Sequence, residues 1–189
     1  MQTDELLVAQ TLQGDLKAFE ELVIRYQRQV FAIVYRITTQ YQESEDITQD
    51  VFLAVFHKLN QFDVSKKFSP WIQKIAVNTC ISALRKKNRA FMVEFDEAYI
   101  SQDVGSTATD FGNPQAAVLK QELRDDINKA MLELPMNYRT MLVLRYQLEL
   151  SNPEIAEALG ISKENVEVKV HRARKALRRI LNQKWHEKE

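Results

Sequence analysis

Apolar residues recur along most of the chain at the spacing of an α-helix. The clearest run lies between Ala18 and Ile37, where apolar side chains return every three or four residues and predict one buried helical face. We find no stretch with the two-residue alternation that is typical of a strand. The pattern predicts an all-α fold, with helices at 4–13, 15–37, 43–59, 71–87, 115–133, 137–147, 153–159 and 163–185.

The helical pattern stops between Ala90 and Pro114. This stretch is rich in Gly, Ser, Thr, Asn and Asp and contains no Lys or Arg. A connection of about 25 residues is long for a compact domain, and it therefore indicates a domain boundary. We expect two small helical domains, at 1–89 and 115–189, joined by a flexible acidic linker at 90–114.

The second expected domain contains two helices around a tight corner. Ser151 and Glu154 form a capping box at the start of the first helix, and Gly160 stands where a helix end favours a left-handed backbone. Ser162 caps the second helix. The inner stripe of that second helix is predicted to be Val166, Val170, Ala173, Leu177 and Ile180. Its opposite face carries Lys169, His171, Arg172, Lys175 and Arg179. This layout is typical of a DNA-binding helix-turn-helix, although an ordinary surface hairpin has the same pattern.

The helix predicted at 43–59 is apolar on two faces. One face consists of Ile47, Val51, Ala54 and Val55. The other consists of Phe52, Leu53 and Phe56 beside Glu45, Asp46, Gln49 and Asp50. A helix of this kind is either central in its bundle or binds a partner, and the pattern alone leaves both interpretations open.

The helix predicted at 71–87 carries a polar line along one side. The line consists of Lys74, Asn78, Ser82 and Arg85, followed by Lys86 and Lys87. Asparagine offers a donor and an acceptor to a base edge, and lysine and arginine neutralise phosphates. Trp71 at the head of the line can stack on a base, but a largely buried tryptophan is the more common case. A basic helix end is often only a solvated face, yet the second basic helix favours a bipartite DNA reader.

The net charge of the 189 residues is zero, so the total charge does not predict a nucleic-acid partner. The charges are segregated, with bases at 85–89 and 169–179 and acids at 43–50 and 94–110. Differences in sign between segments are more informative than their sum.

The residue types required by the common catalytic and metal sites are sparse. Cys80 is the single cysteine, which excludes an intramolecular disulfide and favours a buried thiol. His57, His171 and His186 lie far apart in sequence, so we expect no metal, no cofactor and no catalysis. The start of the chain lacks a signal-peptide pattern, and no apolar run reaches the roughly 20 residues that span a bilayer. We therefore expect a cytoplasmic protein without direct membrane insertion.

Several long motifs, taken together and in order, resemble the extracytoplasmic-function sigma factors of bacteria. The motifs are GDLKAFEELVIRYQRQVF, SEDITQDVFLAVFHKLNQFD, FSPWIQKIAVNTCISALRKK and LPMNYRTMLVLRYQLELSNPEIAEALGIS followed by VKVHRARKAL. They cover nearly all of the chain outside the expected linker. The resemblance implies a region-2 helical bundle, a linker and a region-4 helix-turn-helix.

The resemblance also implies the partners and the residues that meet them. The partners are core RNA polymerase, promoter DNA and an anti-sigma factor, which in this family is often anchored in a membrane. The polymerase-binding residues would be Glu45, Asp46, Gln49, Asp50 and Phe52. The residues at the −10 element would be Lys74, Asn78, Ser82, Arg85, Lys86 and Lys87, with Asn78 and the loop 60–69 holding a flipped base. The residues at the −35 element would be Lys163, Asn165, Glu167, Val168, Lys169, His171, Arg172 and Lys175.

Four residues depart from the common pattern of this family. Ser82 replaces a frequent Asp, Asn165 a frequent Thr, Glu167 a frequent Lys or Arg, and Val168 a frequent Ser. Glutamate can accept a hydrogen bond from cytosine N4, and an exposed valine suits a thymine methyl group. The resemblance therefore implies the DNA role of this helix without its base preference.

Two other functions fit parts of the sequence. One is a stand-alone helix-turn-helix repressor or activator, and the other is a helical scaffold that binds proteins only. The acidic and aromatic face at 43–59 discriminates between a sigma factor and a simple repressor, because a repressor has no use for that face.

Overall fold

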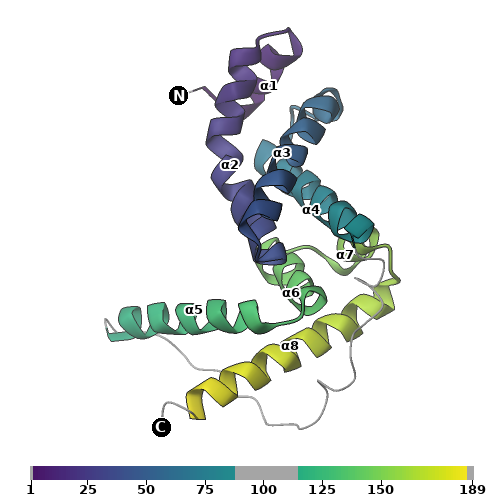
Figure 1. Cartoon of the computed structure of the whole chain (residues 1–189). Helices are drawn as coiled ribbons and strands as arrows, with labels where there is room; N and C mark the ends of the chain where they lie inside the picture. Colours follow the sequence, from purple (N-terminus) through teal and green to yellow (C-terminus); the bar gives the residue numbers. More distant parts are fainter. Residues whose placement is uncertain (1, 88–114, 187–189) are drawn as a thin grey trace. The chain divides into compact units, whose positions relative to one another are not determined.

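The computed structural model describes the backbone of residues 2–87 and 115–186, and the side chains of all these except 115–121. Every regular element in these ranges is a helix, as the sequence predicts (Figure 1). The helices are α1 (Asp4–Leu12), α2 (Leu16–Thr38), α3 (Tyr41–Lys58), η1 (Leu59–Gln61), α4 (Phe68–Lys87), α5 (Gln115–Glu133), α6 (Met136–Leu142), the π-helical turn η4 (Val143–Gln147), α7 (Asn152–Leu159) and α8 (Lys163–His186). The linker predicted at 90–114 lies outside the described residues.

The chain divides into two compact units. Unit 1 contains α1 to α4 together with residues Glu157–Gly160, and unit 2 contains α5, α6, η4, α8 and the start of α7 through Ala156. Two helical units agree with the predicted fold class, whereas the domain bounds at 1–89 and 115–189 stay a prediction.

Unit 1 is a bundle in which α2 packs against α1, α3 and α4, and α3 also packs against α4. Asp15 caps α2, since its carboxylate accepts a hydrogen bond from the backbone N–H of Lys17 at 2.9 Å. The apolar stripe of α2 is buried as predicted, with Leu22, Val30 and Ile37 each no more than 1% exposed. Burial of this stripe holds α1, α3 and α4 against α2.

Helix α4 begins three residues earlier than predicted, at Phe68. The ring of Phe68 is 1% exposed and lies 5.3 Å from Tyr26, 5.4 Å from Phe62 and 5.5 Å from Trp71, measured between ring centroids. Burying this ring keeps the chain helical ahead of Pro70, so the loop predicted at 60–69 is shorter than expected. Its open part spans only residues 62–67.

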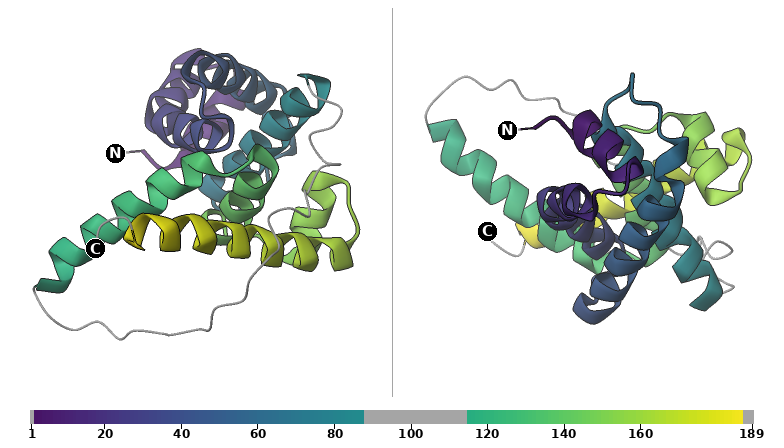
Figure 2. Two further views of the ribbon diagram at one scale, coloured as in Figure 1. Left: turned by 60° about the horizontal axis from the view of Figure 1, so that its bottom comes forward. Right: turned by 90° about the horizontal axis from the view of Figure 1, so that it is seen from above.

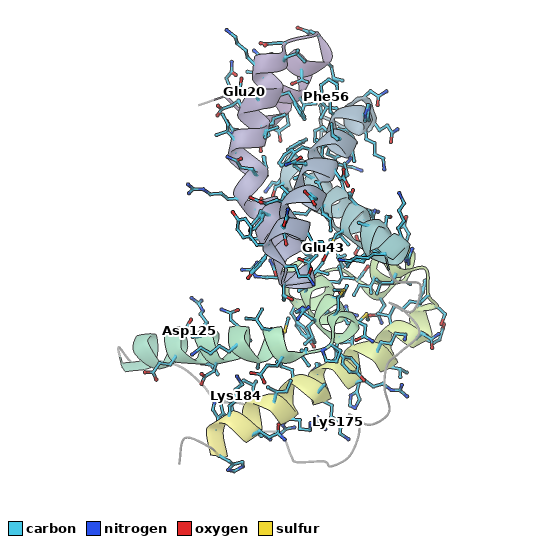
Figure 3. All side chains as sticks on the ribbon, viewed as in Figure 1. Glu20, Glu43, Phe56, Asp125, Lys175 and Lys184 are labelled. Carbon is cyan, nitrogen blue, oxygen red and sulfur yellow. The ribbon has the colours of Figure 1, made fainter. Side chains whose placement is uncertain are left out.

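In unit 2, α5 and α6 both pack against α8, and α5 runs beside α8 (Figures 1 and 2). The indole N–H of Trp185 donates a hydrogen bond to Asp126 at 3.2 Å, and Lys184 pairs with Glu133 at 2.5 Å. Figure 3 shows Lys184 where the two helices meet. These two contacts, which we call the α5–α8 clasp, fix the C-terminal end of α8.

The predicted inner stripe of α8 was wrong at one position. Val166, Val170, Ala173 and Ile180 are buried as expected, but Leu177 is half-buried and Ala176 is fully buried in its place. Ala173 and Ala176 are both 0% exposed, so this side of α8 is buried through small side chains, which allow neighbouring helices to approach closely.

The single helix predicted at 137–147 is divided in two. The α-helical part ends at Leu142, and residues Val143–Gln147 form the π-helical turn η4. The backbone N–H of Leu148 donates to the carbonyl of Val143 at 3.1 Å, which is the wider spacing of a π-helix. The spacing of apolar residues does not distinguish an α-helix from a π-helix over a stretch of only a few residues.

Candidate nucleic-acid and protein interfaces

The corner between α7 and α8 is built as the sequence predicts. The carboxylate of Glu154 accepts hydrogen bonds from the backbone N–H of Ser151 at 2.9 Å and from its hydroxyl at 2.6 Å. Gly160 has a left-handed φ of 57°, and Ser162 accepts from the N–H of Asn165 at 3.3 Å. Two capped helices on either side of a glycine corner present α8 as the second helix of a helix-turn-helix.

The predicted −35 residues lie along the N-terminal half of α8, from Lys163 to Lys175. Val168 is 49% exposed, although it is aliphatic. The exposed polar members are Lys163, Asn165, Glu167 and His171, and the half-buried members are Lys169, Arg172 and Lys175. Partial burial lowers the pKa of Lys169, and the charge of Arg172 lowers it further.

The polar line of α4 faces solvent throughout. Its exposed residues are Lys74, Asn78, Ser82, Arg85, Lys86 and Lys87. The opposite side of α4 is buried, including Val77 at 1% exposure and Cys80 at 0%. Burial raises the pKa of the Cys80 thiol to about 12, so the thiol is an inert part of the core, as predicted.

One residue of this line is already paired within unit 1. The ammonium group of Lys87 lies 2.9 Å from the carboxylate of Glu43 on α3, and the Glu43 side chain is only 16% exposed. Lys87 must therefore break this ion pair before it can reach a phosphate.

The Trp71 side chain is not fully buried, but only part of its ring is accessible to stack on a base. It is half-buried, and its ring centroid lies 5.2 Å from that of Phe62 and 5.5 Å from that of Phe68. One part of the indole therefore belongs to an aromatic cluster at the N-terminal end of α4.

The loop before α4 is a stable turn. Asp63 accepts hydrogen bonds from the N–H of Ser65 at 3.0 Å and from its hydroxyl at 2.7 Å. These bonds lower the pKa of the Asp63 carboxyl. Val64 at the tip is 53% exposed, so the loop presents an apolar side chain on a hydrogen-bonded frame.

Both faces of α3 carry apolar side chains, and the far face is largely open to solvent, although the ring of Phe56 packs edge-on against Phe19 of α2 at 5.0 Å between centroids. Ile47, Val51 and Val55 are buried, whereas Leu53 is 60% and Phe56 43% exposed. Glu45, Asp46, Gln49 and Asp50 are exposed on the same side, and Phe52 is half-buried. Glu43 and Phe56 lie toward opposite ends of the helix (Figure 3). We call this acidic and apolar side the outer face of α3.

Tyr41 was missed by the sequence prediction, which started this helix at Glu43. It is 63% exposed, and a hydrogen bond to Glu45 raises its pKa. Its ring lies 5.2 Å from Phe31 of α2, so it extends the outer face toward α2. The sequence signal that could have identified Tyr41 is its position directly before the acidic first turns of α3.

Within the described residues, no group of three or more His, Cys, Asp and Glu side chains could hold a metal ion. None of the helices in this part of the chain is long and apolar enough to cross a membrane.

Comparison with known proteins identifies the two units. Residues 22–90 match the family described as Sigma-70 region 2, and residues 124–177 match Sigma-70, region 4. The ECF RNA polymerase sigma factor SigW of Bacillus subtilis is 35% identical over 179 residues, which cover 92% of this chain and 94% of SigW. The chain belongs to the ECF RNA polymerase sigma factors. The ECF sigma-E factor of Escherichia coli K12 is also similar to this sigma factor, at 30% identity over 93% of the chain and 92% of its own length.

The fold is shared with a solved sigma factor. The structure of RpoE from Bartonella quintana in complex with the anti-sigma factor NepR matches with a TM-score of 0.54 and 20% identity, over 88% of this chain and 98% of RpoE. A sigma factor is a transcription initiation factor and not an enzyme. This sigma factor acts with RNA polymerase on promoter DNA, which sets aside the stand-alone regulator and the scaffold.

Proposed function

We propose that the outer face of α3 binds the polymerase core. The observation that carries this proposal is the exposure of Leu53 and Phe56 beside a row of carboxylates. Exposed apolar side chains surrounded by charges are typical of a protein interface, and the carboxylates would select a basic partner surface. Glu45, Asp46, Gln49, Asp50 and Phe52 are the proposed contact residues, in agreement with the family resemblance.

The polar line of α4 is proposed to bind the −10 element as a single strand. Asn78 is its exposed carboxamide, and Lys74, Arg85 and Lys86 supply positive charge around it. Unstacking a base costs a few kcal/mol, which contacts to the extruded base must offset. The loop 62–67 is proposed to help hold the extruded base. Because Asp63 and Ser65 already order this loop, less conformational entropy is lost when the base binds.

Helix α8 is proposed to read the −35 element in the major groove. Glu167 and Val168 are both exposed, so they can reach base edges, and Lys163, His171 and Arg172 lie on the same stretch of helix. A glutamate favours cytosine and a valine favours a thymine methyl group. The expected −35 element therefore contains a cytosine next to a thymine at the positions that these two residues face.

Regulation by an anti-sigma factor is proposed by analogy with the Bartonella RpoE, which shares this fold and was solved with such a partner. The outer face of α3 would be unavailable to polymerase while that partner covers it. The site of action would be the cytoplasm, where polymerase and promoter DNA meet. Co-purification of the chain from cells tests this part, and recovery of polymerase subunits alone would contradict it.

The test of the main proposal is run-off transcription with purified core polymerase. The chain is added to the core and to a library of promoter fragments, and transcripts that depend on the chain are sequenced. We expect defined start sites preceded by shared −35 and −10 elements. Tight binding of the chain to isolated duplex DNA without any transcript would contradict the proposal.

A further inference from the structure

The segment that precedes α7 contains an arginine whose side chain bonds to both sides of a backbone corner. Arg145 lies in the π-helical turn η4 and is half-buried. One terminal nitrogen donates to the carbonyl of Leu150 at 3.0 Å, and the other donates to the side-chain oxygen of Asn152. Asn152 is the first residue of α7, so one guanidinium group joins the end of η4 to the start of the helix-turn-helix.

The corner between these elements is closed by three hydrogen bonds. Besides the two from Arg145, the N–H of Leu150 donates to the carbonyl of Leu144 at 3.0 Å. The corner also contains Glu149 with a left-handed φ of 52°, a conformation that residues other than glycine rarely adopt. Such a residue persists only where its surroundings hold it, and the bonds around it are those of Arg145 and Leu150.

The two corners that flank α7 are therefore fixed in different ways. At the second corner Gly160 adopts its left-handed φ without a side-chain clash. At the first corner the left-handed residue is Glu149 and not a glycine, and the hydrogen bonds of Arg145 hold the backbone in that conformation. The direction in which the chain enters α7 and then α8 depends on the first corner.

We propose that Arg145 is a positioning residue for promoter recognition, which sets the angle at which α8 meets the −35 element. This inference rests on the proposed role of α8 as the −35 reader. Direct phosphate binding is the competing role for an arginine here. It is disfavoured because both terminal nitrogens already donate to the protein.

The test compares two DNA probes on holoenzyme that is reconstituted from the full chain and core polymerase. One duplex carries the −35 element that run-off transcription defines, and the other carries the same bases scrambled. We expect Arg145→Met to lower the ratio of the two affinities by about tenfold, with an unchanged salt dependence. Arg145→Lys should be intermediate, since one ammonium group cannot serve both acceptors in the fork geometry of arginine.

Two controls separate positioning from a loss of folded protein. Partial unfolding lowers the active fraction for both probes and leaves their ratio unchanged, whereas a displaced α8 changes the ratio. Discrimination at the −10 element, measured on a forked probe, should stay at the wild-type level because α4 belongs to unit 1. Arg124→Met removes an exposed charge from α5 of the same unit and should leave the ratio unchanged.

The remaining outcomes overturn the inference. Equal weakening on both probes with a smaller salt dependence would make Arg145 a phosphate contact. A lowered melting temperature with an unchanged ratio would make it a stabilising residue only. If the wild-type holoenzyme itself does not discriminate between the probes, the proposed role of α8 fails instead.

Discussion

Arg139 is a charged side chain in the interior of unit 2. It is 4% exposed, and burial lowers its pKa from the ordinary value. Its guanidinium group donates to the carbonyls of Leu132 at 3.1 Å and Leu134 at 3.2 Å, just where α5 ends. Carbonyls at a helix C-terminus have no partner within the helix, so Arg139 satisfies groups that burial would otherwise leave unpaired.

Replacing Arg139 by methionine should lower the free energy of unfolding of unit 2 by about 1–3 kcal/mol, since the carbonyls lose their donors. Urea unfolding of the full chain with Trp71 replaced by phenylalanine, which leaves Trp185 as the single tryptophan, measures the change through tryptophan fluorescence. Arg124→Met, an exposed arginine of the same unit, should change it by less than about 0.5 kcal/mol. Equal effects of the two substitutions would show that the buried bonds contribute nothing.

Asn78→Ala should slow open-complex formation about 5- to 100-fold while core polymerase binds with unchanged affinity, because the carboxamide is proposed to contact only the extruded base. Promoter melting and core binding are measured separately on the same preparation. Gln27→Ala, which removes an exposed carboxamide from α2, is the control and should affect neither. Parallel losses in melting and core binding would remove Asn78 from the −10 site.

Helix α3 bears the proposed polymerase surface, and an exposed position on it can be changed without disturbing the core. Leu53→Asp should weaken binding to core polymerase at least about tenfold, because it places a charge in the centre of an apolar contact. Fluorescence anisotropy of a labelled chain gives the affinity. Ile24→Asp on α2, where the original side chain is 56% exposed against 60% for Leu53, is the matched control. Comparable weakening by both would contradict a specific role for α3.

Helix α8 has arginines both within and beyond the stretch Lys163–Lys175, which contains the proposed reading residues. Arg172→Ala should weaken holoenzyme binding to the −35 duplex by about 1–3 kcal/mol if it contacts a base. Arg178→Ala, which changes an exposed arginine beyond the last proposed reading residue, should cost less. Both are titrated at matched salt, because phosphate contacts are strongly salt-dependent. An unchanged affinity of the Arg172 variant would remove this residue from the site.

The helices were predictable because their apolar stripes repeat over several turns. The capping box at Ser151 and the corner at Gly160 were predictable because few residue types suit those positions. The early start of α4 was not, because it depends on the burial of Phe68 among rings from distant parts of unit 1. The same holds for Arg145, whose partners are backbone and side-chain atoms that spacing does not reveal.

The candidate surfaces were predictable in outline and not in detail. Exposure of the α4 line follows from its helical spacing, and the pattern alone identified both faces of α3. The pairing of Lys87 with Glu43 was not predictable, because it joins two helices through one geometry among many. The assignment of each surface to its partner came from the resemblance to a family and not from the pattern of residues.

The molecule consists of two units with separate cores and separate proposed ligands. Each unit buries its own apolar stripe, with α2 at the centre of unit 1 and α8 along unit 2. Bipartite recognition on one chain raises the effective concentration of the second contact once the first has formed. A net charge of zero is compatible with DNA binding because the bases are concentrated on α4 and α8.

Residues 1–89 and 115–189, expressed separately, should each fold cooperatively. Mixed together, they should support promoter-dependent transcription at least about 100-fold less than the intact chain at equal concentration, because the second contact is no longer intramolecular. Thermal unfolding of each piece and run-off transcription of the mixture test the two parts of this prediction. Full activity of the mixture would show that the covalent connection is dispensable.

The length of α8 makes it a lever. Val168 and Lys184 are separated by 16 residues, or about 24 Å along the axis at the rise of an α-helix. A tilt of about 5° at the α5–α8 clasp displaces the other end by about 2 Å, which exceeds the tolerance of a hydrogen bond to a base edge. Substitutions at Asp126 or Glu133 can therefore change which promoters are transcribed, although neither residue belongs to the reading face. Differences in promoter preference among related sigma factors can therefore originate from substitutions on α5 as well as from substitutions on α8.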